Sequence, residues 1–314
     1  MTGCSQKHCF ADTTCALGHI DRAKCEHWKI ESAGKSEGDS QVTAQPTRDV
    51  PWNGYALGTR DLSILGSRGS VLLVGLIGPE DCGKTSLLSF LYMWMLKHGR
   101  LGRWDFAGSW TLGGWESVIQ HSRWTGNPPS FPPHTSSTGR HPGLLHLALR
   151  DQQGNLRDVI FTDAPGEWFT RWSRSPEGAS SEGARWVISQ SDVMIVFVDS
   201  GALADPDRLP QSRRATRDIM ERVGAACEGR PVLITWTKDD ISVETETRNG
   251  LEQSRQRFLP NATSWRTTFV SPETIEKCFA AAIDSGNTAS ATELSDAPLF
   301  TEPFLAFRGK LAKP

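Results

Sequence analysis

The sequence predicts an α/β protein built on a mostly parallel, doubly wound sheet, and three observations carry that prediction. Long apolar segments with strand character alternate with helical patterns through the middle of the chain. The segment 71–88, VLLVGLIGPEDCGKTSLL, joins such a strand to a helix through a glycine-containing loop. Polar motifs follow several of the other predicted strands, at the edge where doubly wound sheets bind their ligands.

Composition excludes several classes of protein. The net charge is −2 and charged residues make up 22% of the chain, so nothing directs it toward nucleic acid or an anionic membrane. No apolar run approaches the ~18 residues that a membrane helix needs, and the N-terminus lacks the apolar core of a signal peptide. We expect a soluble cytoplasmic protein, in which clustered cysteines serve as metal ligands more readily than as disulfides.

Residues 1–30 are predicted to form a small zinc-binding module, because four of the seven cysteines stand there among histidines. The spacings are not the C-x-x-C pairs of common zinc ribbons, so unligated thiols in a loose tail are the alternative. Residues 31–50 are poor in apolar side chains and read as a flexible linker before the main domain, 51–314. The simplest ligand set is Cys4, Cys9, Cys15 and Cys25, with His19 able to replace one of them.

The loop 78–85 has the pattern G-x-x-x-x-G-K-T between a strand and a helix, which is typical of a nucleotide phosphate site. Glycines let successive backbone N–H groups point inward, toward the positive end of the following helix. Lys84 would reach the outer phosphates and the Thr85 hydroxyl would bind Mg²⁺. The expected nucleotide contacts are Gly78, Asp81, Cys82, Gly83, Lys84, Thr85 and Ser86.

The helix after this loop is expected at 84–97, with Gly99 as its stop. The insertion 101–140 that follows is rich in tryptophan, set among Gly, Pro and Ser. Exposed aromatic side chains on loops often anchor partners, whereas a large loop folded onto its own aromatic residues is the simpler explanation. The tryptophans concerned are Trp104, Trp110, Trp115 and Trp124.

Strands are expected at 144–149 and 159–162, and the second ends in the motif DAPG. Asp163, at the tip of a buried strand beside the phosphate loop, can hold Mg²⁺ through water, and Gly166 can offer its N–H to the γ-phosphate. A hydroxyl group should complete the Mg²⁺ shell, and Thr138 is favoured because it is nearest to the following strand; a plain polar loop is the alternative. The hydroxyl candidates are Thr135, Ser136, Ser137 and Thr138.

A third motif, TKDD, follows the predicted strand 231–236. There Asp240 can accept hydrogen bonds from the N1–H and 2-amino groups of guanine, a donor pair that adenine does not present, while the Lys238 stem lies along the base. A buried strand at 192–199 and a helix at 211–227 come before it. After it we expect a strand at 267–270, with Ser271 as the N-cap and Pro272 as the first residue of a helix, then a loose insertion at 285–299 and a closing helix at 300–310.

Taken in order, GPEDCGKT, a threonine before a strand, DAPG, TKDD and a serine after a strand resemble the five guanine-nucleotide motifs of P-loop GTPases of the Ras-like and translation-factor (TRAFAC) class, over about residues 70–284. The resemblance implies GTP or GDP with Mg²⁺ as the ligand. It implies catalytic roles for Lys84, Thr138, Gly166 and Glu167, Mg²⁺ contacts from Thr85, Thr138 and Asp163, and contacts on the base side from Thr237, Lys238, Asp240 and Ser271.

More narrowly, the N-terminal Cys/His segment, FAGSWTLGGWE and TDAPGEWFTRW are similar to the bacterial double-GTPase family of predicted conflict systems. That similarity implies protein partners, including a second GTPase. The expected function is therefore a GTP-binding and slowly hydrolysing molecular switch. The alternatives are an ATPase on the same scaffold and a non-hydrolysing scaffold that nucleotide stabilises.

Several residues depart from the pattern of the TRAFAC class. Glu167 stands where the class uses Gln or His to position the attacking water, and a carboxylate can act only as an acceptor, so we expect slow turnover. Thr237 replaces an Asn and should weaken a bond that ties the loop, and Pro272 would remove an N–H contact to guanine. Glu80 and Asp81 would hinder an arginine finger from a partner, which leaves a cis arginine, Arg140 or Arg171, as a candidate.

Overall fold

The computed structural model describes residues 56–58, 61, 62, 65, 71–123, 130 and 143–286, together with the backbone of two short strands near the N-terminus. The chain divides into two compact units, residues 1–49 and 50–314. In the first unit, β1 (Gly3–Cys4) pairs antiparallel with β2 (Trp28–Lys29). Outside the described residues lie the Cys4 side chain, the other predicted zinc ligands (Cys9, Cys15, Cys25 and His19), the linker 31–50, and the predicted insertion and helix beyond residue 286.

Among the described residues, the second unit contains one eight-stranded sheet with the order β10-β9-β8-β3-β7-β6-β5-β4. The neighbours from β10 to β7 are parallel, and those from β7 to β4 are antiparallel. The predicted α/β fold with a mostly parallel sheet is therefore confirmed. The strands are β3 (Val71–Ile77), β4 (Arg100–Leu101), β5 (Trp104–Gly108), β6 (Gly143–Arg150), β7 (Leu156–Asp163), β8 (Val193–Asp199), β9 (Val232–Thr237) and β10 (Thr263–Arg266).

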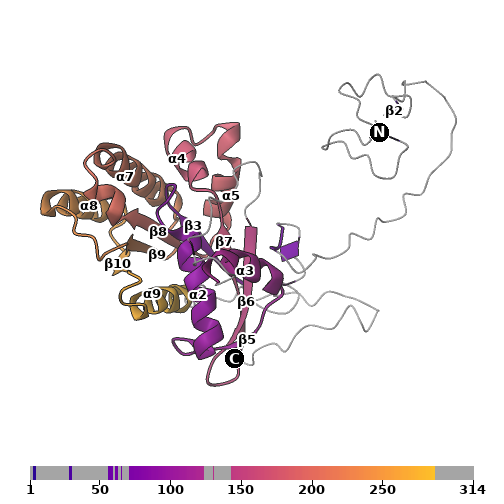
Figure 1. Cartoon of the computed structure of the whole chain (residues 1–314). Helices are drawn as coiled ribbons and strands as arrows, with labels where there is room; N and C mark the ends of the chain where they lie inside the picture. Colours follow the sequence, from indigo (N-terminus) through magenta and orange to yellow (C-terminus); the bar gives the residue numbers. More distant parts are fainter. Residues whose placement is uncertain are drawn as a thin grey trace. The chain divides into compact units, whose positions relative to one another are not determined.

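Helices cover both faces of this sheet (Figure 1). Residues of β8 alternate between the faces: Val193, Ile195 and Phe197 pack with α2, α3 and α9, and the residues between them pack with α4, α5 and α7. The helices are α2 (Lys84–His98), α3 (Leu112–Ile119), α4 (Gly166–Arg174), α5 (Glu182–Gln190), α6 (Ser200–Ala204), α7 (Leu209–Ala226), α8 (Thr245–Phe258) and α9 (Glu273–Ser285), with short 3-10 turns at Gln120–Ser122 and Ala179–Ser181.

The last strand differs from its prediction, which placed it at 267–270. The strand is Thr263–Arg266, whose residues pair with Leu233–Trp236 of β9, and the chain then turns through a bridge between Thr268 and Ser271. The apolar pair Phe269 and Val270, which made the segment resemble a strand, is 43% and 75% exposed. The N-cap of α9 is Pro272 rather than Ser271, so the helix begins one residue later than predicted.

The described part of the tryptophan-rich insertion forms β4, β5 and α3, and two of its tryptophans are part of the hydrophobic core. Trp115 is fully buried and stacks on Tyr92 of α2 with ring centroids 5.4 Å apart. Its indole N–H donates to the carbonyl of His146 at 2.9 Å. Trp104 is also buried. These two side chains therefore fit the simpler explanation, a segment folded onto its own aromatic residues. Trp124 lies outside the described residues.

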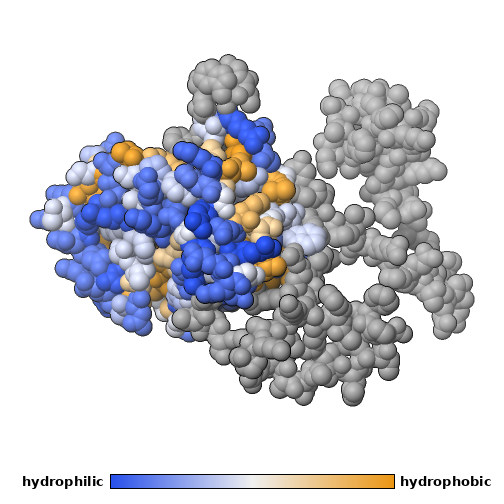
Figure 2. Space-filling view, turned by 90° about the horizontal axis from the view of Figure 1, so that it is seen from below, coloured by the Kyte–Doolittle hydropathy of each residue, from blue (hydrophilic) through white to orange (hydrophobic). Residues whose placement is uncertain are grey.

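The surface of the described part is mostly hydrophilic, with separate apolar patches, when seen from below (Figure 2). Within the described residues, no helix combines the length and the apolar character needed to cross a membrane. The exposed large apolar side chains are Leu96, Phe106, Leu112, Leu156, Ile241, Phe269 and Val270.

Candidate nucleotide site

The loop between β3 and α2 has the backbone that the glycine pattern predicts. Gly83 caps α2 with a φ of 94°, and Asp81 has a φ of 58°, so both residues take the left-handed region that curls the chain. A Cβ atom on Gly78 would lie 2.8 Å from Cys82 Sγ and 2.9 Å from Phe197 Cβ. The backbone at Gly78 therefore packs closely against Cys82 and Phe197, and a side chain at position 78 would force these residues away.

Lys84 lies inside this loop rather than in solvent. The side chain is 6% exposed, and Nζ donates to the carbonyls of Gly78 at 3.0 Å and Pro79 at 2.8 Å. Buried charges cost free energy unless polar groups surround them, and these carbonyls meet that need. The ammonium group is thus held within the concave loop. Burial raises the pKa of the neighbouring Cys82 thiol, with the nearby Lys84 opposing the shift, so the thiol is neutral at neutral pH.

Thr85 and Asp163, the two predicted Mg²⁺ contacts that the structure describes, are hydrogen-bonded to one another. Thr85 Oγ1 donates to Asp163 Oδ1 at 2.9 Å. The preceding residue of β7, Thr162, accepts the Leu76 N–H at 3.0 Å and so fixes β7 against β3. An oxygen pair of this kind suits Mg²⁺. In the described part of the chain, no group of three or more His, Cys, Asp or Glu side chains could hold a metal ion.

Gly166 brings the DAPG motif against the phosphate loop. It opens α4 after the N-cap Pro165, and a Cβ atom there would lie 2.4 Å from Glu80 N and 2.5 Å from Pro79 O. Only glycine allows this approach of two backbones. The next residue, Glu167, forms an i,i+4 ion pair with Arg171 on the same helix, and the two side chains are 36% and 47% exposed.

The TKDD motif is tied to the phosphate loop by two side chains. Thr237 is 1% exposed, and its hydroxyl donates to Cys82 O at 2.9 Å, with Val198 O at 3.2 Å. Lys238 Nζ donates to Asp81 O at 3.0 Å and pairs with Asp199 Oδ2 at 2.9 Å. The Thr237 hydroxyl therefore bonds the loop directly, and the weakening expected from threonine in place of asparagine stays a prediction.

Asp240 has a partner that the sequence analysis missed. Thr268 Oγ1 donates to Asp240 Oδ1 at 2.5 Å, and the Thr268 N–H itself bonds to Thr274 Oγ1. Ser271, the residue chosen from sequence, lies three residues farther on, and its carbonyl accepts from Thr274 Oγ1 at 2.6 Å. The prediction of Ser271 depends on a last strand at 267–270. With the strand at Thr263–Arg266, two hydroxyl residues follow it: Thr267, which donates to Trp236 O at 3.0 Å, and Thr268, which donates to Asp240.

The described site residues therefore meet at one edge of the sheet, at the carboxyl ends of β3, β7, β8 and β9. Hydrogen bonds or close backbone contacts connect the phosphate loop to DAPG on one side and to TKDD on the other. Ser86 lies in the first turn of α2. Thr138 and the other hydroxyl candidates, together with Arg140, lie outside the described residues.

Comparison with known proteins identifies a family for most of the chain. A family model described as Double-GTPase 2 matches residues 72–286, which include all three motifs. Among solved structures, the chain is similar to nucleolar GTP-binding protein 1 from Plasmodium falciparum, with 9% sequence identity and a TM-score of 0.42, over 69% of this chain and 87% of that chain. No curated protein matches the sequence.

Proposed function

Because the chain belongs to the Double-GTPase 2 family, we propose that it binds GTP and GDP with Mg²⁺ at this edge of the sheet and hydrolyses GTP slowly. The observation that carries the proposal is the direct bonding of two motifs: Thr237 and Lys238 donate to the carbonyls of Cys82 and Asp81. These bonds hold together the loop to which we assign base recognition and the loop to which we assign phosphate binding, and recognition of a whole nucleotide requires both.

On the phosphate side, Lys84 and the backbone N–H groups at the start of α2 stabilise charge on the β- and γ-phosphates. The Lys84 ammonium group already sits among loop carbonyls, so it needs only a short side-chain movement to exchange them for phosphate oxygens. Thr85 would bind Mg²⁺ directly and Asp163 would hold it through water, and the ion would neutralise further phosphate charge. Thr138 is the proposed second direct protein ligand, and Gly166 would offer its N–H to the γ-phosphate.

On the base side, Asp240 accepts from the N1–H and 2-amino groups of guanine, and Thr268 holds the carboxylate in position. The stem of Lys238 lies along the base. Asp240→Asn should abolish the preference for GTP over ATP, and it should improve binding of xanthosine triphosphate, because an asparagine amide can donate to the 2-oxo group of xanthine. Asp207→Asn, an exposed change of the same kind, is the control. Unaltered GTP preference in Asp240→Asn would refute the assignment.

Hydrolysis is proposed to be slow because Glu167 cannot donate a hydrogen bond and is already paired with Arg171. Multiple-turnover phosphate release should disappear in Lys84→Ala and rise in Glu167→Gln, since glutamine can donate as well as accept. Arg171→Ala tests the cis arginine: unchanged turnover in that variant would remove Arg171 from the mechanism. The segments around Thr138 and 166–172 are proposed to order on the γ-phosphate and to relax after hydrolysis, as a switch.

The Glu167–Arg171 pair also supports a second candidate, a scaffold that binds nucleotide without hydrolysing it. Purified protein that binds GTP tightly, yet releases no phosphate above the rate of Lys84→Ala, would favour the scaffold over the switch. Preference for ATP over GTP in equilibrium binding would favour an ATPase over both.

The wider setting is proposed from the family resemblance. We expect protein partners, including a second GTPase, within a bacterial conflict system in the cytoplasm. We also propose that Cys4, Cys9, Cys15 and Cys25 bind one Zn²⁺. Elemental analysis should find about one zinc per chain in the wild type and a loss of zinc in a variant carrying Cys15→Ser and Cys25→Ser. Zinc well below one per chain in both proteins would refute this ligand set.

A further inference from the structure

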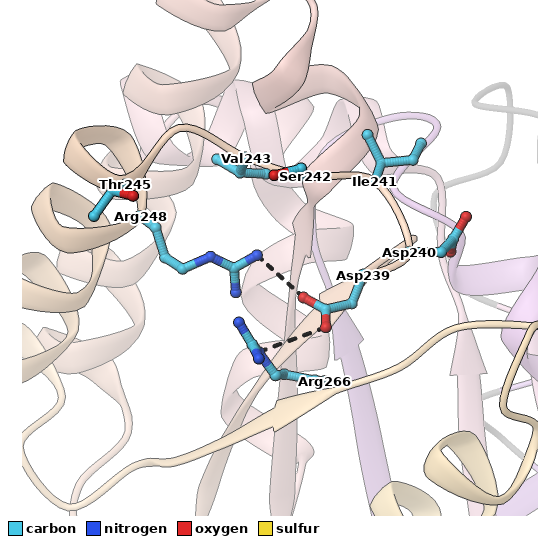
Figure 3. A pocket seen from close by; sticks show the side chains of 8 residues that line it. All are labelled: Asp239, Asp240, Ile241, Ser242, Val243, Thr245, Arg248 and Arg266. Carbon is cyan, nitrogen blue, oxygen red and sulfur yellow. Dashed lines mark hydrogen bonds and ion pairs between the residues drawn. The ribbon is translucent and has the colours of Figure 1, made fainter.

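A cavity of about 400 Å³ lies between the start of α8, the end of β10 and the loop after β9. Two arginines line it, Arg248 from α8 and Arg266 from β10, and both guanidinium groups point toward Asp239 (Figure 3). Arg248 Nη2 is 3.1 Å from Asp239 Oδ1, and Arg266 Nε is 3.5 Å from Asp239 Oδ2. Asp240 also borders the cavity, but its carboxylate points away from the arginines and accepts from Thr268.

Two acidic and two basic residues line this cavity. Only one of the two carboxylates, that of Asp239, pairs with Arg248 and Arg266, because the Asp240 carboxylate accepts from Thr268. A guanidinium group has several N–H donors. Within the described residues, the two side chains together donate a single hydrogen bond, from Arg248 to Asp239, because the contact of Arg266 is an ion pair only. Most N–H donors of the two guanidinium groups are therefore left for a ligand or for water.

The arginines differ in how firmly they are held. Arg248 is 25% exposed and its guanidinium carbon lies 4.6 Å from the ring centroid of Trp236, which fixes the planar group by cation–π contact. Arg266 is 62% exposed and can turn toward a ligand. The wall also includes Thr245, the first residue of α8, and the apolar side chain of Val243.

We propose that this cavity is a second ligand site, which binds the phosphate group of a small phosphorylated molecule between Arg248 and Arg266. Phosphate is favoured over a single carboxylate because two guanidinium groups can each bond a pair of its oxygens. The volume exceeds that of a phosphate ion, so the organic part of the ligand lies along the loop at Ile241 and Val243. The site is separate from the phosphate loop, whose side chains do not line this cavity.

A ligand in this site changes the position of the loop after β9, which carries Asp240. Its effect on nucleotide binding rests on the proposed function. Asp239 precedes Asp240, its N–H donates to Thr267 O at 3.2 Å, and the turn is closed by Ile241 N–H to Lys238 O at 2.9 Å. A phosphate that takes over the two guanidinium groups frees the Asp239 carboxylate and alters this turn. The ligand therefore changes the affinity for guanine nucleotide, and nucleotide changes the affinity for the ligand by the same factor.

The test is titration of the full chain with inorganic phosphate at constant ionic strength, followed by calorimetry. Ionic strength is held with chloride because exposed charges are screened by salt. Loss of one charge-assisted contact in Arg266→Gln should weaken phosphate binding by about 10-fold. Arg214→Gln, an exposed arginine on α7, is the matched control and should change binding by less than about 2-fold. Lys84→Ala reports separately on phosphate bound at the phosphate loop.

Phosphate binding that survives in Lys84→Ala and falls in Arg266→Gln supports the proposal. Binding lost in Lys84→Ala and kept in Arg266→Gln, or no binding at all, overturns it. If Lys84→Ala does not fold, the wild type saturated with GDP and Mg²⁺ replaces it. Coupling is measured as the affinity for GDP with and without phosphate, and the change should vanish in Arg266→Gln. Failure of GDP to bind would refute the proposed function alone, because the phosphate titration does not depend on it.

Discussion

The hydroxyl group of Thr237 is expected to contribute measurably to the stability of the protein, and Thr237→Val tests this. Valine has nearly the same shape as threonine, so the substitution removes the hydroxyl without opening a cavity. The hydroxyl has one proton, shared between Cys82 O at 2.9 Å and Val198 O at 3.2 Å, so one net hydrogen bond is lost rather than two. Thr237 is 1% exposed, and water cannot replace the bond. We expect a loss of about 1 to 2 kcal/mol in the free energy of unfolding.

Urea unfolding followed by circular dichroism measures this change, which should lower the midpoint and leave the m-value unaltered. For a domain of this size, each kcal/mol corresponds to about 2 to 4 °C in the melting temperature, so the variant should melt roughly 2 to 8 °C lower. The affinity for GDP should fall as well, because the bond positions the backbone of the phosphate loop. That second result depends on the proposed function, whereas the loss of stability does not.

Thr235→Val is the matched control. Thr235 lies on the same strand and is fully buried, but its hydroxyl contacts Cys278 Sγ at 3.1 Å, and sulfur is a weak hydrogen-bonding partner. The control should lose less than about 1 kcal/mol and keep its affinity for GDP. A Thr237→Val protein within about 0.5 kcal/mol of wild type, or no less stable than Thr235→Val, would show that the bond between the two motifs carries little free energy.

Three further predictions concern other contacts. Gly166→Ala should destabilise the protein by about 1 to 3 kcal/mol in thermal unfolding, because the new methyl group meets the backbone of the phosphate loop. Its control is Gly250→Ala, in open space on α8, which should stabilise the protein by about 0.5 to 1 kcal/mol in the same measurement. Arg230→Ala should cost about 2 to 3 kcal/mol in urea unfolding, since the guanidinium group donates to carbonyls at the C-terminal ends of α5 and α7; a neutral result would contradict the capping role. Burial, and after it the hydrogen bond to Glu116, raises the pKa of Tyr92 to about 12. The neutral phenol therefore stabilises the fold below pH 10, and this contribution, up to about 2 kcal/mol, is lost as the pH rises toward 12. Tyr92→Phe should be less stable than wild type at pH 9 and approach it near pH 12; a constant difference across that range would refute the shift.

The parts of the fold that the sequence predicts well are those specified by local chemistry. The phosphate loop needs glycine where φ is positive, and Gly83 reveals that need in the sequence. The strand Val193–Asp199 is buried on both faces, so its continuous apolar run identifies it without knowledge of its neighbours. The same reasoning misplaced the last strand, because Thr263–Arg266 is a mostly polar edge strand while the exposed Phe269 and Val270 have strand-like side chains.

The contacts that sequence reasoning missed depend on register between distant segments. Thr268 reaches Asp240 only because β10 pairs with β9 at the register Arg266 to Trp236, and nothing in the sequence of either strand specifies that pairing. The pair Glu167 and Arg171, in contrast, was available from its i,i+4 spacing alone. Spacing can predict contacts within a helix, whereas contacts between strand ends require the sheet order.

The contacts that hold the phosphate loop on its two sides determine which elements would move in the proposed switch. Gly166 touches the loop through backbone at Pro79 and Glu80, without a side chain that could give way. On the opposite side, Lys238 is bonded to both the loop carbonyl of Asp81 and the buried Asp199. If the loop moves when phosphates bind, the start of α4 must move with it. On the other side, Lys238 at the end of β9 must also move or lose its bond to Asp81. Because α4 carries Glu167 and Arg171, a helix that contacts the loop directly is also the one that bears the hydrolytic candidates.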